Sequence, residues 1–354
     1  MESLTIALAM VVLSGDVLLA FARRLLVKSR VPVEDAELVA GSLIAASLRG
    51  VDSHGIQLLP YYLERIQAGD FNIHACGKVV RETGACLVYD GCNGLGQVVA
   101  DICTAHANRL AKAFGLGLAV ARQSNHFGAC AFWAQRMSSA GNVGIVLSNT
   151  PPLAPPWQGK ELRLGTNPVC VSVPGARRWL LDMATTTVAK WRILQAAREN
   201  VPNIPAGWAM NREGIPTTDT AEAANGLLMP LGGYKGYGLA MMVEILCGVL
   251  SGGSISLELG GFPAHKKPAA ISHFFLAIDV TRFMSMDEFN AVLEKLVRYM
   301  KDTPAAAGYA ELLVAGVSGG EEWTQNRWFE KGPGVSAEGG MKKAGGFLHR
   351  PASA

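Results

Sequence analysis

The sequence predicts an α/β protein, and three observations lead to this prediction. Up to about residue 66 the apolar residues recur at helical spacing. From Lys78 onward, short apolar runs typical of buried strands alternate with longer segments of helical periodicity. The chain has 354 residues, of which 49% are hydrophobic and only 17% charged. Such a composition is typical of a compact globular protein with a large core, and it excludes a disordered chain.

The first elements are predicted to be helices. Asp16 to Val27 has apolar residues at helical spacing, with basic residues on the other side. Val31–Asp35 marks the start of a second helix, because proline and early acidic residues suit a first turn. That helix runs through Ala36–Ser47, and a third is predicted from Leu58 to Ile66. The second and third helices are joined by a segment that contains the triplet Ser53–Gly55.

The rest of the chain is predicted to alternate between strands and helices. Strands are predicted at 79–83, 85–89, 117–121, 143–149, 169–173, 179–182 and 274–279, and helices at 98–113, 129–140, 190–199, 238–250 and 286–300. Residues 202–218 contain repeated proline and glycine breakers, so this segment is predicted to be a connecting loop.

A glycine-rich turn follows the second predicted strand and suggests a dinucleotide-binding fingerprint. Its glycines are Gly91, Gly94 and Gly96, a spacing that differs from G-x-G-x-x-G. No clear βαβ unit with a downstream acidic residue accompanies it. We therefore interpret it as a β-turn that leads into the 98–113 helix.

Charge and cysteine content exclude some classes of function. A net charge of +3 without a run of lysine or arginine does not predict nucleic-acid binding. Seven cysteines are scattered without a C-x-x-C pair, which is typical of reduced, buried thiols in a cytosolic enzyme, and no metal site is predicted.

Both ends of the chain are predicted to lie outside the fold. The apolar stretch from Leu4 to Leu13 is too short for a membrane span, and Glu2 stands where a signal peptide needs a basic residue. Residues 1–14 are interpreted as an N-terminal extension, with a cleaved signal as the alternative. Residues 335–354 are rich in glycine and lysine, so we expect a poorly ordered tail.

Three side chains stand out by residue type. His54 can exchange a proton near neutral pH, and the adjacent Ser53 hydroxyl can hold or relay that proton. His126 lies at a predicted strand-to-helix junction, where backbone amides can meet an anion, although Ser124 and Asn125 could equally form a helix N-cap there. Lys235 lies among glycines and could meet a phosphate or be an ordinary surface lysine.

Six motifs in one order are more informative than any of them alone. They are Gly50–Ile56, Ser124–Gly128, Gly165–Pro168, Asp182–Thr186, Ile204–Ala209 and Gly233–Leu239. In this order they resemble the malate/L-lactate dehydrogenase family, which includes ureidoglycolate dehydrogenase and the cyclic-ketimine (delta1-piperideine-2-carboxylate) reductases. The resemblance extends from about Gly15 to about Gly334.

The resemblance implies an architecture. It implies an α/β fold distinct from the Rossmann fold, with a mixed central sheet and a helical domain made from both chain ends. Residues 78–224 would form the cofactor-binding sheet domain, and 15–77 with 225–334 the helical part for substrate binding and dimerisation. It further implies a cytoplasmic homodimer with active sites near the subunit interface.

The resemblance also implies roles for individual residues. His54 would be the general acid/base that exchanges a proton with a 2-oxo or 2-hydroxy acid, with help from Ser53. Asp182 would orient or charge His54, although it could instead cap the helix that follows it. His126 would lie near the substrate and the nicotinamide. Tyr62 and Asn149 would contact the substrate, although Tyr62 could also be ordinary core.

NAD or NADP is the implied cofactor. The residues assigned to it are Ser124, Gly165, Thr166, Asn167, Thr185, Thr186, Lys190, Lys235 and Gly236. Lys190 or Arg192 could favour the 2′-phosphate of NADP.

Two positions depart from the family pattern and leave alternatives open. Leu58 stands where an arginine usually grips the substrate carboxylate, and Trp191 stands where glycine is usual. Two alternatives to 2-hydroxy acid oxidation therefore stay open. One is reduction of a cyclic imine carboxylate, and the other is cofactor binding with lost catalysis. A Ser53/His54/Asp182 hydrolase is disfavoured, because adjacent Ser and His rarely reach nucleophile geometry and no G-x-S-x-G elbow is present.

Overall fold

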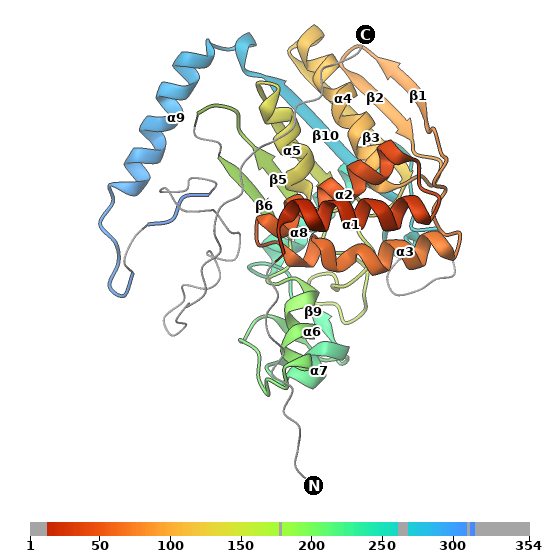
Figure 1. Ribbon diagram of the computed structural model, residues 1–354. Coiled ribbons are helices and arrows are strands. Elements are labelled where there is room, and N and C mark those ends of the chain that lie inside the picture. The colour runs from red at the N-terminus through yellow and green to blue at the C-terminus, as the bar shows by residue number, and fades with distance from the viewer. Residues whose placement is uncertain (1–12, 177–178, 261–267, 310–311, 316–354) are drawn as a thin grey trace.

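A computed structural model describes residues 13–176, 179–260, 268–309 and 312–315. Its centre is a seven-stranded sheet with the order β1-β2-β3-β10-β4-β5-β6 (Figure 1). The strands are β1 (Lys78–Thr83), β2 (Cys86–Asp90), β3 (Leu116–Ser124), β4 (Asn142–Ser148), β5 (Val169–Ser172), β6 (Leu180–Met183) and β10 (Ile271–Asp279). Within the described residues β2 and β3 pair in parallel and the other neighbours pair antiparallel. The predicted α/β class with a mixed central sheet is confirmed.

The central strand comes from late in the chain. β10 lies between β3 and β4 and pairs with both along most of its length. Both faces of this strand are covered, which explains its continuous apolar run: Phe275 and Ala277 face one core, and Phe274 faces another. The sheet is therefore not confined to residues 78–224, because β10 belongs to the segment assigned to the helical part.

Helices cover both faces of the sheet. α4 (Gly96–Phe114) and α5 (Cys130–Ser139) pack on one face around Trp133. α8 (Tyr234–Glu244) and the π-helical turn η3 (Ile245–Val249) pack on the other. The prediction placed the start of α8 four residues late, because glycines in its first turn obscure the helical signal.

The predicted N-terminal helices form a layer with its own core. They are α1 (Gly15–Lys28), α2 (Val33–Leu48) and α3 (Leu59–Gln67), which pack around fully buried Tyr62 and Leu43. Two short 3-10 turns, η1 (Asp52–His54) and η2 (Ile56–Leu58), join α2 to α3. The Ser-His-Gly triplet therefore lies in the connection between the second and third helices, as predicted.

A small lobe lies apart from the central sheet, below it in Figure 1. It consists of α6 (Lys190–Arg198), β7 (Ala209–Met210), β8 (Pro216–Thr217), α7 (Thr220–Asn225) and β9 (Leu227–Leu228). Its strands form a sheet with the order β8-β7-β9 around a core that includes Ile193 and Leu228. The prediction that 202–218 is only a connecting loop was wrong, because two-residue strands have no periodic signal.

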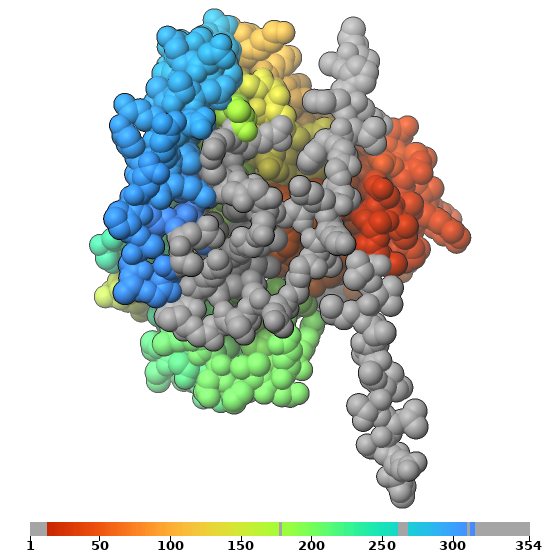
Figure 2. Space-filling view, turned by 60° about the vertical axis from the view of Figure 1, so that its left-hand side comes forward, coloured from red at the N-terminus to blue at the C-terminus, as the bar shows by residue number. Residues whose placement is uncertain are grey.

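The helix α9 (Met286–Lys301) lies along one side of the molecule (Figures 1 and 2). It begins with a capping box in which Ser285 and Glu288 satisfy each other's backbone N–H groups. Two further 3-10 turns, η4 (Ser256–Glu258) and η5 (Val280–Arg282), flank β10 in sequence.

Some sequence predictions lie outside the described residues. These are the extension at 1–12 and the tail at 335–354. Among the residues that the structure describes, none of the helices combines the length and the hydropathy that crossing a membrane requires.

Candidate active site

The turn between α2 and α3 presents His54 with one ring nitrogen already engaged. The Ser53 hydroxyl lies 2.9 Å from His54 Nδ1. A Cβ on Gly55 would lie 2.2 Å from Ser47 Oγ, and that hydroxyl accepts a hydrogen bond from the Ile56 N–H at 2.9 Å. The glycine of the triplet is thus required for packing of the turn on α2. The engaged Nδ1 leaves Nε2 as the nitrogen that can face a substrate.

His126 follows β3 and is held in the same way. The Tyr62 hydroxyl lies 2.6 Å from His126 Nδ1, and the Gly128 N–H points to the same nitrogen at 3.4 Å. A nitrogen that accepts from two donors has no hydrogen of its own, so the neutral ring has its proton on Nε2. His126 can therefore donate a hydrogen bond from Nε2.

The two histidine rings lie together although they are 72 positions apart in the sequence. Their centroids are 5.5 Å apart and their planes differ by 23°. Both side chains are partly exposed, whereas Tyr62 beneath them is fully buried. The structure thus brings together His54, Ser53, His126 and Tyr62, the group that the sequence assigned to proton transfer and substrate contact.

Burial makes both rings neutral near pH 7. It lowers the pKa of His54 to about 4. Burial and the neighbouring imidazoles His54 and His273 lower the pKa of His126 to about 3. The expectation that a carboxylate raises the pKa of His54 is not met, because desolvation dominates. In this state His54 can accept a proton at Nε2, whereas His126 donates a hydrogen bond from its Nε2.

Asp182 lies at the end of β6, and the contacts given for it are with groups other than His54. Its Oδ2 accepts a hydrogen bond from the Ala131 N–H at 3.1 Å, in the first turn of α5. Burial raises the pKa of Asp182 to about 6, against the opposing effect of the Arg49 guanidinium and the Ala131 N–H. The carboxylate therefore caps α5, not the helix that follows it in sequence, while Arg49 leads directly into the triplet turn. Its action on His54 stays a prediction.

The motifs assigned to the cofactor converge at a second place. The Thr185 N–H and hydroxyl both donate to the Thr166 carbonyl at 2.9 Å. The Leu231 N–H donates to the Thr185 carbonyl at 2.9 Å, and the Gly236 N–H donates to the Leu231 carbonyl at 2.7 Å. Three segments distant in the sequence are thus joined by backbone contacts.

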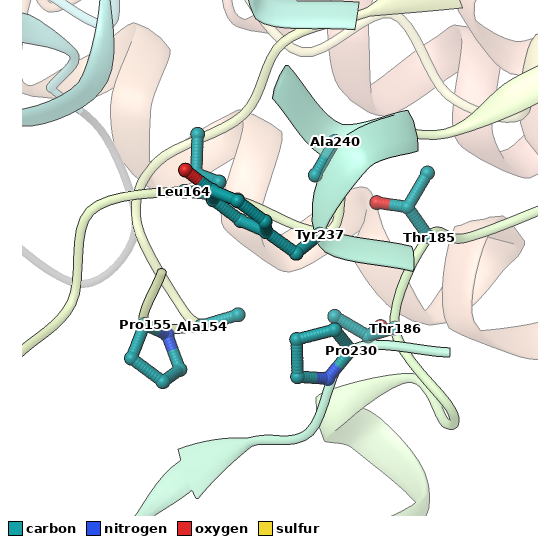
Figure 3. Close-up of a pocket in the computed structure, with 9 residues that line it drawn as sticks. Ala154, Pro155, Leu164, Thr185, Thr186, Pro230, Tyr237 and Ala240 are labelled. Carbon is teal, nitrogen blue, oxygen red and sulfur yellow. The ribbon is translucent and has the colours of Figure 1, made fainter. Parts of the chain in front are cut away.

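A recess lies where these segments meet (Figure 3). Its cavity volume is about 10 Å³, and it is lined by Ala154, Pro155, Leu164, Gly165, Thr185, Thr186, Pro230, Tyr237 and Ala240. Tyr237 extends across it toward Leu164, and Pro155 and Pro230 lie opposite. A cavity of this size holds about one water, whereas pockets for drug-sized ligands are typically about 300–1,000 Å³, so a dinucleotide would lie over this recess and not inside it.

The adjoining start of α8 suits an anion. Gly232 and Gly233 have φ of 59° and 68°, and no side chain caps the helix. Lys235 is exposed in the first turn. The Gly236 N–H of this turn is already bonded to the Leu231 carbonyl, so the helix dipole and the Lys235 ammonium are the groups that favour phosphate. The residues present therefore fit a phosphate-containing cofactor.

Six residues assigned to ligands have internal partners. The Thr185 hydroxyl donates to the Thr166 carbonyl and the Thr186 hydroxyl to the Val188 carbonyl. Ser124, Asn149 and Asn167 are fully buried. The Lys190 ammonium donates to the carbonyls of Ala223 and Gly226 at 3.0 and 3.1 Å, at the end of α7. Burial and these contacts give all six a structural role, and their direct contact with a ligand stays a prediction.

The glycine turn before α4 holds the His126 loop, a role that the sequence did not reveal. A Cβ on Gly96 would lie 2.2 Å from the Asn125 carbonyl oxygen and 2.4 Å from that of His126. The Asn125 side-chain amide donates to the carbonyls of Asn93 and Gly94 at 3.1 and 2.8 Å. The only signal in the sequence was the cluster of glycines itself, which predicted a turn but not its partner.

Comparison with known proteins decides the family. The family model described as malate/L-lactate dehydrogenase matches residues 13–330. The chain belongs to this family. It is therefore a member of a family of dehydrogenases that act on hydroxy acids, as the motifs predicted.

Individual members are similar over nearly their whole length. A malate dehydrogenase of Pyrococcus horikoshii is 39% identical over 313 residues, which cover 86% of each chain. The solved structure of sulfolactate dehydrogenase from Methanocaldococcus jannaschii has a TM-score of 0.82 at 34% identity, with 93% of each chain covered. Delta1-piperideine-2-carboxylate reductase from Pseudomonas syringae has a TM-score of 0.76 at 27% identity, covering 83% of this chain and 90% of its own.

Proposed function

We propose that this family member is an NAD(P)-dependent dehydrogenase that interconverts a small 2-hydroxy acid and its 2-oxo acid, with His54 as the general acid/base. The stacked pair of His54 and His126, each with Nδ1 held by a hydroxyl, is the observation that carries this proposal. The names of the malate and sulfolactate dehydrogenases support the substrate class.

The side chains can perform the proton transfer as follows. In the oxidative direction, neutral His54 accepts the hydroxyl proton at Nε2 while Ser53 holds Nδ1. His126 donates a hydrogen bond from Nε2 to the substrate, oriented by Tyr62. A bound nicotinamide supplies the hydride acceptor or donor. In the reductive direction, protonated His54 returns the proton to the carbonyl oxygen.

We propose that the cofactor lies along the recess and the start of α8. Gly165, Thr166, Thr185 and Thr186 would meet it at the recess, and Lys235 with Gly236 would meet it at the helix start. This binding mode would differ from the Rossmann mode, which uses a glycine fingerprint between parallel strands. Either NAD or NADP is consistent with these groups, and Arg192 is the candidate partner of a 2′-phosphate.

The substrate-binding end differs from the family pattern. Leu58 packs against the core of the helical layer, so no cation occupies this position to pair with the substrate carboxylate. Trp191 is half-buried, and the Arg198 guanidinium lies over its ring at 5.0 Å. The alternative substrate class is a cyclic ketimine carboxylate, supported by the likeness to the piperideine-2-carboxylate reductase.

The first test is turnover with a panel of acids. Purified protein is mixed with NADH or NADPH and with pyruvate, oxaloacetate, 3-sulfopyruvate, phenylpyruvate or piperideine-2-carboxylate, and absorbance at the nicotinamide band is followed. We expect at least one acid to be reduced. The variant His54→Ala should lower kcat by roughly 10²–10⁴-fold, because that is the usual contribution of general acid–base catalysis. Binding of the reduced cofactor, measured by its fluorescence, should not change.

Two outcomes would contradict this proposal. Unchanged turnover in His54→Ala would exclude His54 as the proton donor. His126 would then be the candidate donor, and His126→Ala would be tested in the same assay. Cofactor binding without turnover of any acid would favour the alternative in which catalysis has been lost.

The pH dependence of the reductive reaction follows from the pKa of His54. The acid form is required, and its fraction falls about tenfold per pH unit above a pKa of about 4. We therefore expect kcat/KM for 2-oxo acid reduction to fall steadily between pH 5 and 7. In the same range the ionisation of His54 should not change kcat/KM for 2-hydroxy acid oxidation, because the base form that this direction requires already predominates. A reductive kcat/KM that is flat over this range would contradict His54 as the acid.

We also propose that the protein is a cytoplasmic homodimer. Leu239, Met242, Ile245 and Val249 are spaced along one side of α8 and η3 and are all exposed, between 37% and 57%. A contiguous apolar stripe of this kind favours a partner surface, and sedimentation velocity would measure the mass. The seven cysteines are free thiols, which is typical of a reducing compartment. The prediction that they are buried holds for four and is wrong for Cys76, Cys86 and Cys92, which are exposed.

A further inference from the structure

His273 is a buried histidine that the proposed reaction does not use. It lies in β10, in the middle of the central sheet, and its side chain has no exposed surface. Its Nδ1 lies 2.9 Å from the Ser148 hydroxyl at the end of β4. Its Nε2 lies 3.0 Å from the Ser124 hydroxyl and 3.2 Å from the Asn125 carbonyl oxygen. The ring thus bridges the ends of the two strands that flank β10.

These contacts define the state of the ring. A carbonyl oxygen only accepts, so His273 Nε2 has the hydrogen and donates it to Asn125. Nδ1 then accepts from the Ser148 hydroxyl. Burial lowers the pKa of His273 to about 3, which agrees with a neutral ring.

The same ring also holds the residue after His126. Phe127 stacks on His273 with centroids 4.3 Å apart and planes only 7° apart. His273 therefore contacts Asn125 on one side of His126 and Phe127 on the other. The backbone position of His126 is fixed between these two contacts, and the Tyr62 hydroxyl then orients its ring.

We propose that His273 is a positioning residue that fixes the loop 124–127 and thereby directs His126 toward the substrate. This inference rests on the proposed function, because that function gives His126 its role at the substrate. No apolar side chain could replace His273 fully. Phenylalanine would keep the stack on Phe127 but would leave the Asn125 carbonyl and the two serine hydroxyls without their ring partner.

Two substitutions separate the contacts that His273 makes. His273→Phe keeps an aromatic ring against Phe127 and removes both ring nitrogens. His273→Gln keeps an N–H donor at the position of Nε2 and removes the ring. Phe274→Leu is the matched control, because it changes a buried neighbour on the same strand that packs on the opposite face of the sheet.

The experiment combines kinetics with a measurement that does not need turnover. In protein labelled with ¹³C at the histidine Cε1, the signal of His126 is assigned by its loss in His126→Ala. We expect His273→Phe to shift the His126 signal and to lower kcat at least about 10-fold. The Kd of the reduced cofactor should not change. His273→Gln should restore part of kcat, and Phe274→Leu should leave both the His126 signal and kcat near wild type.

The outcomes separate this inference from the proposed function. If the wild-type protein reduces no acid in the panel, the proposed function fails, while the His126 signal still shows whether His273 positions the loop. An unshifted His126 signal with wild-type kcat in His273→Phe would overturn the positioning role. An equal fall of kcat in Phe274→Leu would also overturn it, because the effect would then come from general weakening of β10.

Discussion

Replacing Gly96 with alanine is expected to lower kcat at least about 100-fold. The new Cβ would lie 2.2 and 2.4 Å from the carbonyl oxygens of Asn125 and His126, so the backbone of the His126 loop must move. A displacement of about 1 Å at a group that contacts the substrate can cost on the order of 100-fold in rate. Steady-state reduction of the best acid from the panel measures kcat, and cofactor fluorescence should show a Kd close to wild type.

Gly41→Ala is the matched control for this substitution. Gly41 lies in α2, and a Cβ there would meet no atom within 4 Å. Alanine should therefore leave kcat unchanged and raise stability by roughly 0.5–1 kcal/mol, the usual difference between the two residues inside a helix. Wild-type kcat in Gly96→Ala would mean that the turn does not fix His126 in the working enzyme.

Local patterns were sufficient to predict most elements of the fold. α1, α2 and α9 have apolar residues at helical spacing, and their termini have the expected acidic or capping residues. The arrangement of strands was less accessible. Nothing within Ile271–Asp279 specifies that this strand lies between β3 and β4, because strand order depends on contacts between distant segments.

The site shows the same division between local and distant information. The motifs around His54 and His126 predicted a shared site, and the adjacent Ser53 hydroxyl at His54 was visible in the sequence. The Tyr62 hydroxyl at His126 was not, because it depends on packing of α3 against the His126 loop. Lys190 was assigned to the cofactor because it is basic, yet its ammonium is held by carbonyls of a lobe that the sequence did not reveal. His273 looks like an ordinary strand residue until its partners are known.

The substitution Gly236→Ala is expected to weaken cofactor binding by at least about 10-fold. A Cβ there would lie 2.3 Å from the Leu231 nitrogen and 2.6 Å from the Thr185 carbonyl oxygen. Both neighbours are backbone atoms and cannot rotate away, so the first turn of α8 must separate from the Thr185 segment. Because Thr185 and Tyr237 line the recess, its shape would change. Titration of the reduced cofactor by fluorescence measures the Kd.

Gly238→Ala tests whether this loss is specific to the buried side of the helix. Gly238 lies two residues further along α8, and a Cβ there would meet no atom within 4 Å. We expect its Kd to equal that of the wild type, with stability the same or slightly higher. A wild-type Kd in Gly236→Ala would exclude contact between the start of α8 and the cofactor. An equal loss of cofactor affinity in both variants would instead indicate that the exposed side of α8 also contributes to cofactor binding. The cofactor site would then adjoin the proposed subunit interface.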